Sequence, residues 1–350
     1  MKIAQVSPLI ESVPPKFYGG TERIVSYLTE ELVRQGHEVM LFASGDSQTS
    51  AELVPCSPKA LRLDPRVHDP FPHYMLMLEQ IRRRADDFDI LHFHIDYLHY
   101  PLFRDIASRT VTTQHGRLDL ADLQPLFAEF EDMPLVSISD RQRQPLPSAR
   151  WVATVYHGLP PDLHSFSEAG ANGYLAFLGR ICPEKRPDRA IEIARRTGIE
   201  LKIAAKVDKV DRAYFEEVVR PLLDDPLVEF VGEIGEERKT EFLGGARALL
   251  FPIDWPEPFG LVMIEAIACG TPVIAWRCGS VPEVIDQGVN GFVVDSIDGA
   301  VAALEKVDSI DRRGVRRGFE ARFTVERMAR NYLRVYESLV SAEPLALRVA

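Results

Sequence analysis

Two glutamates, Glu257 and Glu265, lie on either side of a predicted helix start, and their type and spacing suit a phosphorylated, hydroxyl-rich ligand. Apolar residues recur with helical spacing from Leu261 to Ala268, directly after Gly260. Backbone N–H groups at a helix start point outward and favour anions, so this segment predicts a phosphate site. Two carboxylates would repel the phosphate itself but accept hydrogen bonds from hydroxyl groups around it. A nucleotide sugar has that arrangement, and its predicted contacts are Glu257, Phe259, Gly260, Leu261, Val262 and Glu265.

Each glutamate also has an ordinary interpretation, because most surface carboxylates bind no ligand. Glu257 would then be a solvated loop residue and Glu265 a surface position on an amphipathic helix. The whole phrase Glu257-Pro-Phe-Gly-Leu-Val-Met-Ile-Glu265 is more specific, since it resembles the E-x7-E signature of retaining glycosyltransferases, and most of all glycosyltransferase family 4. This resemblance implies an α/β protein of the GT-B fold, in which two Rossmann-like, doubly wound domains face each other across a cleft.

The length and composition of the chain fit two globular domains. At 350 residues the chain exceeds what one hydrophobic core usually serves, and 46% hydrophobic with 27% charged residues is typical of a folded, soluble protein. A formal net charge of -11 argues against a nucleic-acid partner, which needs clustered basic residues. The 4 cysteines form no C-x-x-C pair and no zinc-like spacing, as expected for reduced thiols in the cytoplasm.

No secretion signal or integral membrane segment is expected. Residues 1–7 are too short for the apolar core of a signal peptide and are followed by Pro8 and Glu11. No uncharged run reaches the roughly 18 residues of a membrane span. A cytoplasmic protein is therefore predicted, and its oligomeric state is left open, with a homodimer among the expectations.

The first part of the chain alternates strand and helix patterns, as in a parallel, doubly wound sheet. One helix is predicted to begin after Gly19 and Gly20. A glycine pair alone is a weak signal, because turn geometry explains most of them. The phrase from Tyr18 to Val25 resembles the amino-terminal domain of the same family, which implies that both glycines lie near the donor. Residues 46–72 show no clear period and are predicted as a long connection.

Histidines lie at the ends of two predicted strands. Residues 89–94 form one strand with His92 and His94 on the same face, and residues 110–113 form another that leads to His115. No carboxylate or thiolate at a matching spacing completes a metal site, and the resemblance implies a reaction without metal. Similarity to the family's Thr-x-His-Gly phrase implies that His115 contacts the donor sugar. His94 is a predicted acceptor-site residue.

The domain boundaries are predicted from linker composition and from the family resemblance. The prolines and glycines between Pro160 and Gly173 indicate a hinge. The predicted domains are 1–160 on the acceptor side and 161–322 on the donor side. Residues 323–350 are expected to form a last helix that crosses back to the first domain.

Two basic residues follow the first predicted strand of the second domain. Arg180 and Lys185 could hold a diphosphate there and stabilise it as it leaves. Basic loop residues are usually only solvated, but the family resemblance places a Gly-Arg and a Lys at this position. The ligand role is therefore the prediction.

The resemblance implies a retaining, metal-independent hexosyltransferase without a cofactor. Its donor would be a UDP-, GDP- or ADP-linked sugar, and its acceptor a hydroxyl of a small molecule, a glycan or a lipid-linked sugar. Two alternatives stay open: a nucleotide-sugar 2-epimerase and a non-catalytic nucleotide-sugar-binding subunit. A dinucleotide oxidoreductase is disfavoured, because no G-x-G-x-x-G follows the first strand. The predicted catalytic residues are His115, Arg180, Lys185 and Glu257.

Overall fold

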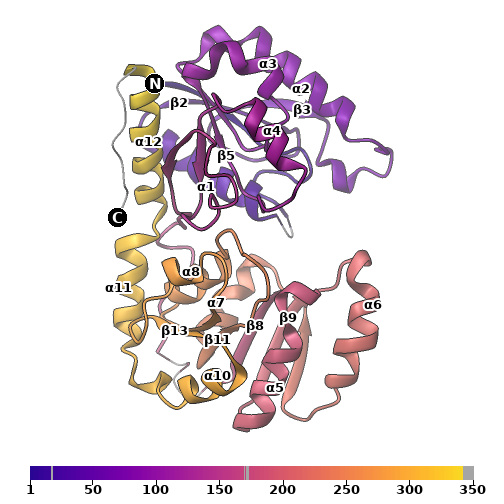
Figure 1. Ribbon diagram of the computed structural model, residues 1–350, viewed down its shortest axis with the longest axis vertical. Helices are drawn as coiled ribbons and strands as arrows, with labels where there is room; N and C mark the ends of the chain where they lie inside the picture. The colour runs from indigo at the N-terminus through magenta and orange to yellow at the C-terminus, as the bar shows by residue number, and fades with distance from the viewer. Residues whose placement is uncertain (17–18, 169, 171–172, 342–350) are drawn as a thin grey trace. The chain divides into compact units, whose positions relative to one another are not determined.

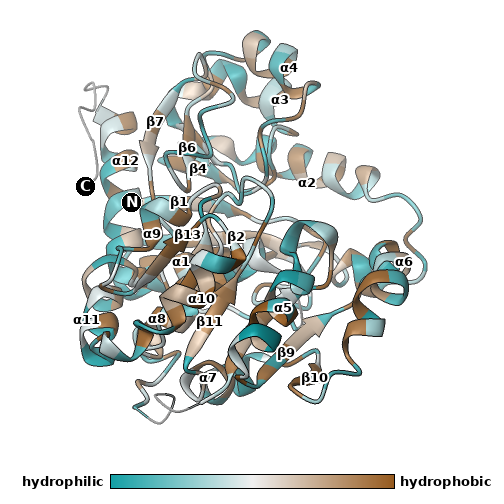
Figure 2. Cartoon of the chain, turned by 60° about the horizontal axis from the view of Figure 1, so that its bottom comes forward, coloured by the Kyte–Doolittle hydropathy of each residue, from teal (hydrophilic) through white to brown (hydrophobic). Residues whose placement is uncertain are grey.

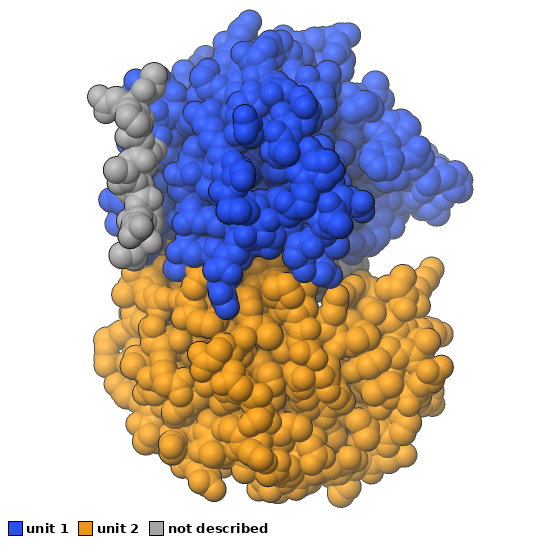
Figure 3. All heavy atoms as spheres, viewed as in Figure 1, with its two compact units in different colours: residues 1–160, 325–350 blue, residues 161–324 orange. Residues whose placement is uncertain are grey.

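The computed structural model describes residues 1–16, 19–168, 170 and 173–341, and it divides the chain into two compact units. Unit 1 consists of Met1–Pro160 together with the chain from Val325 onward, and unit 2 consists of Pro161–Thr324 (Figure 3). Each unit contains one parallel sheet with helices packed around it (Figure 1). The chain thus leaves unit 1 after its sheet is complete, builds unit 2, and returns to unit 1 with its last helix.

The sheet of unit 1 has seven strands, namely β1 (Lys2–Val6), β2 (Glu38–Ser44), β3 (Glu52–Ser57), β4 (Ile90–Phe93), β5 (Thr110–Thr113), β6 (Leu135–Ser137) and β7 (Trp151–Thr154). Their spatial order is β3-β2-β1-β4-β5-β6-β7. Ile3 of β1 lies opposite Val39 of β2 and Ile90 of β4, so apolar side chains form rows across the sheet. The central strands β4 and β5 are buried along their whole length, as expected for parallel strands covered on both faces.

Unit 1 has five α-helices in its described residues: α1 (Gly20–Arg34), α2 (Phe71–Arg83), α3 (Tyr100–Phe103), α4 (Leu123–Glu129) and α12 (Val325–Ser341). The final helix α12 packs against α1 and buries Met328, Tyr332 and Tyr336. Their spacing of four residues places them on one face of the helix. No helix in the described parts of the chain combines the length and apolar character that crossing a bilayer requires.

Strand β3 corrects the expectation that residues 46–72 are only a connection. It pairs in parallel with β2 and forms the edge of the sheet. Its sequence contains Pro55, which removes a backbone donor and is tolerated at an edge because no further strand needs that N–H. Pairing with β2 therefore decided the structure of a segment whose own pattern is weak.

The sheet of unit 2 has six strands: β8 (Leu175–Arg180), β9 (Leu201–Lys206), β10 (Val228–Gly232), β11 (Ala248–Phe251), β12 (Val273–Trp276) and β13 (Gly291–Val294). Their spatial order is β10-β9-β8-β11-β12-β13, and all neighbours are parallel. The helices are α5 (Pro187–Thr197), α6 (Arg212–Tyr214), α7 (Glu236–Gly244), α8 (Leu261–Ala268), α9 (Val281–Val284), α10 (Ile297–Leu304) and α11 (Arg312–Arg322). Helix α8 contacts α7, α11, β11 and β12, and β11 is among the most apolar strands (Figure 2).

Both sheets are doubly wound, since the first strand of each lies inside the sheet with later strands on both sides. In unit 1, β1 lies between β2 and β4, and in unit 2, β8 lies between β9 and β11. This is the Rossmann strand order, so the predicted class of two Rossmann-like α/β domains is confirmed. Ligands of such sheets bind beyond the carboxyl ends of the strands where the order reverses.

Candidate active site

The order of strands in unit 2 reverses between β8 and β11, and the structure brings two predicted site residues together there. Lys185 follows β8, and Glu257 follows β11. The Lys185 ammonium donates a hydrogen bond to Oε2 of Glu257. The pair therefore occupies the position at which a doubly wound sheet binds its ligand.

Aromatic groups complete the surroundings of this ion pair. Nζ of Lys185 lies 5.3 Å from the ring centre of Phe251 and 5.2 Å from that of Trp255, which suits cation–π attraction. Nε1 of Trp255 donates a hydrogen bond of 3.1 Å to Oε2 of Glu257. Only 12% of the Glu257 side chain is exposed, so the alternative that it is a solvated loop residue is wrong.

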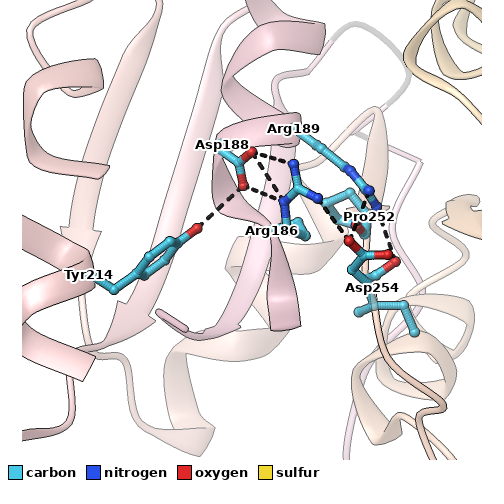
Figure 4. Close-up of polar contacts among 7 residues, drawn as sticks. Arg186, Asp188, Arg189, Tyr214, Pro252 and Asp254 are labelled. Atoms are coloured by element: carbon cyan, nitrogen blue, oxygen red, sulfur yellow. Dashed lines mark hydrogen bonds and ion pairs between the residues drawn. The ribbon is translucent and has the colours of Figure 1, made fainter. Parts of the chain in front are cut away.

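A cluster of charged residues fixes the two loops that carry the pair (Figure 4). Arg186 has a left-handed backbone with φ 51° and begins the turn into α5. Its Nη1 donates to Asp254 at 2.9 Å, and its Nη2 donates to Asp188 at 2.7 Å. Arg189 donates to the same Asp254 carboxylate at 3.1 Å and to the Pro252 carbonyl at 3.1 Å.

This cluster has a structural role. The hydrogen bond to Asp188 raises the pKa of Arg186 further above its usual range. The Asp254 backbone N–H also donates to the Glu184 carbonyl at 2.8 Å. The loops after β8 and β11 are thereby tied to each other, and Lys185 is held beside Glu257.

Arg180 is placed differently from Lys185. It ends β8, and its guanidinium lies near the carboxylates of Glu184 at 3.7 Å, Asp208 at 3.8 Å and Asp211 at 3.5 Å. Asp208 and Asp211 follow β9, whereas Glu257, the partner of Lys185, follows β11. The structure therefore surrounds the two predicted diphosphate ligands with separate sets of acidic groups, and a diphosphate role for Arg180 stays a prediction.

Gly260 occupies the start of α8, as the sequence predicts. Its backbone is left-handed with φ 80°, and an added Cβ would lie 2.9 Å from Cε of Met263 and 3.1 Å from the Phe251 ring. Glycine is therefore required by both conformation and space. Leu261 and Val262 form the first turn of α8, where backbone N–H groups have no partner within the helix.

Phe259 precedes this helix start and is buried, with 2% of its surface exposed. Its ring packs edge-on against that of Phe323, with ring centres 6.3 Å apart. Oγ of Ser280 donates to the Phe259 carbonyl at 2.6 Å. A donor contact by Phe259 would thus be made by the backbone and not by the ring.

Glu265 lies in α8 and is buried, with 3% of its surface exposed, so the alternative of a surface position is wrong. Its Oε1 accepts a hydrogen bond of 2.7 Å from Nζ of Lys239, which belongs to α7. Lys239 could not be predicted as a site residue, because nothing in its local sequence pattern distinguishes it from other helical lysines. Only the packing of α7 against α8 identifies it as the partner of Glu265.

One group of metal-type ligands also lies here. Ligand atoms of His164, Glu236 and Glu265 lie within 4.8 Å of one another. The Lys239 ammonium lies 2.7 Å from Glu265 and 3.1 Å from Glu236, so a fixed cation already pairs with both carboxylates and offsets one of their two charges. A divalent ion would have to compete with this ammonium, and the expectation of a metal-free site stays a prediction.

Gly279 is a second residue of the site that was not among the predicted ones. Its backbone is left-handed with φ 52°, and an added Cβ would lie 2.2 Å from the carbonyl oxygen and 2.4 Å from the nitrogen of Glu257. The next residue, Ser280, donates its backbone N–H to the same carbonyl at 3.0 Å. The only sequence feature that could have indicated this role is the phrase Gly279-Ser280, which lies just beyond the carboxyl end of strand β12. The contact shows that Gly279 fixes the backbone that positions the Glu257 carboxylate.

Replacing Gly279 by alanine should destabilise unit 2 by roughly 1–3 kcal/mol and displace the Glu257 loop. We expect affinity for the predicted nucleotide-sugar ligand to fall on the order of tenfold, because small displacements of positioned groups are costly. Gly288→Ala is the matched control, since Gly288 also has a positive φ, 74°, but has no atom within 4 Å of the added Cβ. Calorimetric titration of both variants measures the difference, and equal donor affinities would contradict a positioning role for Gly279.

The predicted site residues of unit 1 lie at the carboxyl ends of its central strands. His94 follows β4 and is 2% exposed, and His115 follows β5 and is half-buried. Nδ1 of His94 lies 2.9 Å from Nε2 of His115, so the two rings share a hydrogen bond. Burial lowers the pKa of His115 to about 3 and that of His94 well below its usual value. Both rings are therefore neutral at physiological pH.

The glycine pair of unit 1 precedes and begins α1. Gly20 is the first residue of this helix, and an added Cβ at Gly19 would lie 2.9 Å from Cβ of Pro15 and 3.1 Å from Oε2 of Glu22. Close packing inside unit 1 thus accounts for Gly19. Tyr18 of the same phrase lies outside the described residues. The donor role of both glycines stays a prediction.

Comparison with known families gives two matches that follow the two units. The family described as Glycosyltransferase Family 4 matches residues 18–156, and the family described as Glycosyl transferases group 1 matches residues 164–312. A curated relative, the phosphatidyl-myo-inositol mannosyltransferase of Mycolicibacterium smegmatis, is 26% identical over 98% of this chain and 95% of the relative.

Solved structures share the fold. AviGT4, a glycosyltransferase involved in avilamycin A biosynthesis, superposes with a TM-score of 0.73 at 24% identity, over 97% of this chain and 98% of that one. HepE of Anabaena, in complex with UDP-glucose, superposes with a TM-score of 0.74 at 16% identity, over 97% of this chain and 100% of HepE.

The two family matches define this protein as a glycosyltransferase, an enzyme that transfers sugars, and its two doubly wound domains share the GT-B fold of these solved structures. The recognised phrase around Glu257 and Glu265 lies within the second family match. The chain belongs to glycosyltransferase family 4.

Proposed function

We propose that this protein is a retaining glycosyltransferase that moves a hexose from a nucleotide-diphosphate sugar to a hydroxyl acceptor without a metal ion. The observation that carries this proposal is the Lys185–Glu257 pair at the reversal point of the unit 2 sheet. The Phe251 ring lies beside both Lys185 and Gly260, so the ammonium and the start of α8 belong to one site.

The charge arrangement favours an exchange of partners on donor binding. A diphosphate on the N–H groups at the start of α8 would attract the Lys185 ammonium, which at present bonds Glu257. Glu257 would then accept hydrogen bonds from sugar hydroxyls. Glu265, held by Lys239, would accept from the ribose hydroxyls.

The leaving group of this reaction is a nucleoside diphosphate, whose charge grows as the glycosidic bond breaks. A positioned ammonium stabilises that charge more in the transition state than in the bound substrate, and this difference accelerates the reaction. Lys185 supplies such a charge without a metal. Lys239 pairs with the carboxylates of both Glu265 and Glu236 and offsets one of their two charges.

Retention of configuration is proposed to proceed by attack from the face that the diphosphate leaves. Double displacement would need a carboxylate nucleophile. The carboxylates next to this site are held by cations, with Glu257 on Lys185, Asp254 on Arg186, and Glu265 on Lys239. These pairings favour stabilising roles for the carboxylates, with the leaving phosphate taking the acceptor's proton.

The acceptor is proposed to be a hydroxyl of a small molecule, a glycan or a lipid-linked sugar. The mannosyltransferase relative is named for phosphatidyl-myo-inositol, and other relatives are named for D-inositol 3-phosphate, including one of Mycolicibacterium smegmatis that is 31% identical over 200 residues, 52% of this chain and 43% of the relative. Inositol and its phosphates are therefore the first acceptors to test. His115 of unit 1 is proposed to contact the donor sugar. His94 is 2% exposed and bonds His115 and Gln5 with its two ring nitrogens, so its predicted acceptor role would be exerted through His115 and not by direct contact.

Thermal unfolding with UDP-, GDP- and ADP-sugars tests the donor first. A ligand at 100 times its Kd stabilises the native state by about 2.7 kcal/mol, so the cognate donor should raise the unfolding temperature where the other nucleotides do not. The selected donor is then incubated with inositol acceptors, with and without EDTA, and the anomeric configuration of the product is read by NMR.

Three outcomes would overturn this function. Conversion of the donor to its epimer would identify an isomerase. Binding without release of nucleotide to any acceptor or to water would identify a binding subunit. Loss of activity in EDTA would contradict the metal-free mechanism.

A further inference from the structure

A continuous hydrogen-bonded chain runs through the interior of unit 1 from His115 to helix α12. Nε2 of His94 lies 2.9 Å from Oε1 of Gln5, on the other side of the ring from its bond to His115. Nε2 of Gln5 donates to the hydroxyl of Tyr336 at 3.2 Å, and that hydroxyl lies 2.7 Å from Nδ1 of His92. Strands β1, β4 and β5 and the last helix each contribute to this chain.

The chain continues from His92 to two hydroxyl groups. Nε2 of His92 lies 2.7 Å from Oγ1 of Thr113, which lies 2.9 Å from the hydroxyl of Tyr332. Both tyrosines belong to α12, and both are fully buried. Each ring nitrogen of His92 and His94 therefore has a partner in the chain, so the proton on one nitrogen determines which nitrogen of the next ring can carry one.

The orientation of the Gln5 amide sets the direction of the chain. Its oxygen can only accept, so His94 carries its proton on Nε2 and accepts on Nδ1. His115 must then donate from Nε2, which leaves Nδ1 of His115 without a proton. On the other side, Nε2 of Gln5 donates to the Tyr336 hydroxyl, which leaves the proton of that hydroxyl for Nδ1 of His92. In this arrangement His92 carries its proton on Nε2 and donates it to Thr113.

We propose that Gln5 and His94 are positioning residues that fix the tautomer of His115, so that its Nδ1 accepts a hydrogen bond from a substrate hydroxyl. His115 is the half-buried end of the chain, whereas Gln5, His92 and His94 are buried. The contact of His115 with a substrate rests on the proposed function. The tautomer of His115 rests only on the hydrogen bonds within unit 1. A hydroxyl that donates to Nδ1 is held in one orientation, and a sugar lacking that hydroxyl binds less well.

The tautomers can be read directly from protein labelled with 15N in its histidine rings. Two-bond 1H–15N correlation spectra at pH 7.5, without ligand, distinguish a proton on Nδ1 from one on Nε2. We expect His92, His94 and His115 all to carry the proton on Nε2. A proton on Nδ1 of His115, or different tautomers within the three, would overturn the proposal.

Gln5→Met tests the link, because methionine has a similar length but replaces the amide oxygen by a sulfur that accepts hydrogen bonds only weakly. We expect the His115 signals to change to a mixture of tautomers and kcat/KM to fall about tenfold. Thr113→Val and Thr112→Val form a matched pair on β5. Thr113 belongs to the hydrogen-bonded chain that starts at His115. The Oγ1 atom of Thr112 lies 2.9 Å from Nε2 of His99, and neither Thr112 nor His99 belongs to that hydrogen-bonded chain. Only Thr113→Val should alter the His92 tautomer. If the His92 signals were the same in both variants, the proposed direction of the hydrogen bonds from His115 to Tyr332 would be contradicted.

Substrate analogues connect the tautomer to binding. We test a series of donors that each lack one sugar hydroxyl. With the natural protein, the donor that lacks the hydroxyl bonded to His115 should have a kcat/KM about tenfold below that of the complete donor. With Gln5→Met, removing that same hydroxyl should cause no further loss. Independent, multiplying losses for every analogue would overturn the contact, even if the tautomer is as expected. Absence of turnover with every nucleotide sugar would instead refute the proposed function and leave the tautomer result standing.

Discussion

Replacing Lys185 by alanine should lower kcat/KM for the nucleotide-sugar donor about 10²- to 10³-fold, the loss expected when one positioned group that stabilises a developing anion is removed. The structure gives a specific reason. Lys185 is 19% exposed, lies between the rings of Phe251 and Trp255, and bonds Glu257. Water therefore replaces its charge poorly. Steady-state kinetics with the donor identified by thermal unfolding measures the loss.

Lys202→Ala is the matched control for this variant. Lys202 belongs to the same sheet and is also ion-paired, lying 2.9 Å from Glu229, but it is near the amino end of β9. Parallel strands place that end on the opposite edge of the sheet from the ligand site, so its kinetics should be unchanged. Similar losses for both lysines would show a general effect on unit 2.

Glu257→Gln separates binding from structure at the same pair. Glutamine keeps the shape of the side chain and can still accept a hydrogen bond, but it removes the negative charge that holds Lys185. If the proposed exchange of partners is correct, nucleoside diphosphate alone should bind more tightly to Glu257→Gln. In this variant the diphosphate no longer competes with a carboxylate for the Lys185 ammonium. Turnover should fall because the sugar loses a strong acceptor. Weaker nucleotide binding in this variant would contradict the exchange.

Lowering the pH from 7 to 5 should unfold unit 1 before unit 2. Burial lowers the pKa of four unit 1 histidines well below the usual value and lowers that of His115 to about 3. Their rings are neutral in the native state, whereas the unfolded chain binds protons below a pH of about 6.5. The contribution of these neutral rings to the free energy of unfolding is therefore fully present above about pH 6.5 and is lost as the pH falls toward 3. The four histidines besides His115 are His92, His94, His99 and His157.

The expected effect is large relative to the stability of a domain. Each proton that the chain takes up on unfolding lowers the free energy of unfolding by about 1.4 kcal/mol per pH unit, and several histidines contribute in the same direction. Whole domains are stable by roughly 5–15 kcal/mol. Unit 2 contains His164 as its single histidine in sequence, so it lacks this source of acid sensitivity.

Hydrogen–deuterium exchange of peptides from each unit, corrected for the intrinsic rate at each pH, measures this difference. Peptides of β4 and β5 should lose protection between pH 6.5 and 5, while those of β11 and β12 keep it. His99→Phe removes one titrating ring from the stack on Phe93, whose ring centre is 3.8 Å away, and should reduce the protons taken up on unfolding by about one. Equal loss in both units, or loss only near pH 4 where carboxylates titrate, would contradict the histidine explanation.

Much of the architecture could be predicted from local patterns. Strand β5 has the predicted bounds, and helix α8 begins directly after Gly260, because apolar periodicity and a glycine N-cap are local features. Strand β3 could not be predicted in this way. Its Pro55 and short polar residues give no clear period, and pairing with β2 supplies the order that its own sequence lacks.

The sequence by itself determined the two Rossmann-like domains, the helix start at Gly260, and the phrase that identifies the family. Tertiary structure alone decided which groups meet. Glu257 pairs with Lys185 across 72 positions, Glu265 pairs with Lys239, and Gly279 packs on the Glu257 backbone. The physical reason is that periodicity acts within single elements, whereas strand order and helix packing set distances between elements that are far apart in the chain.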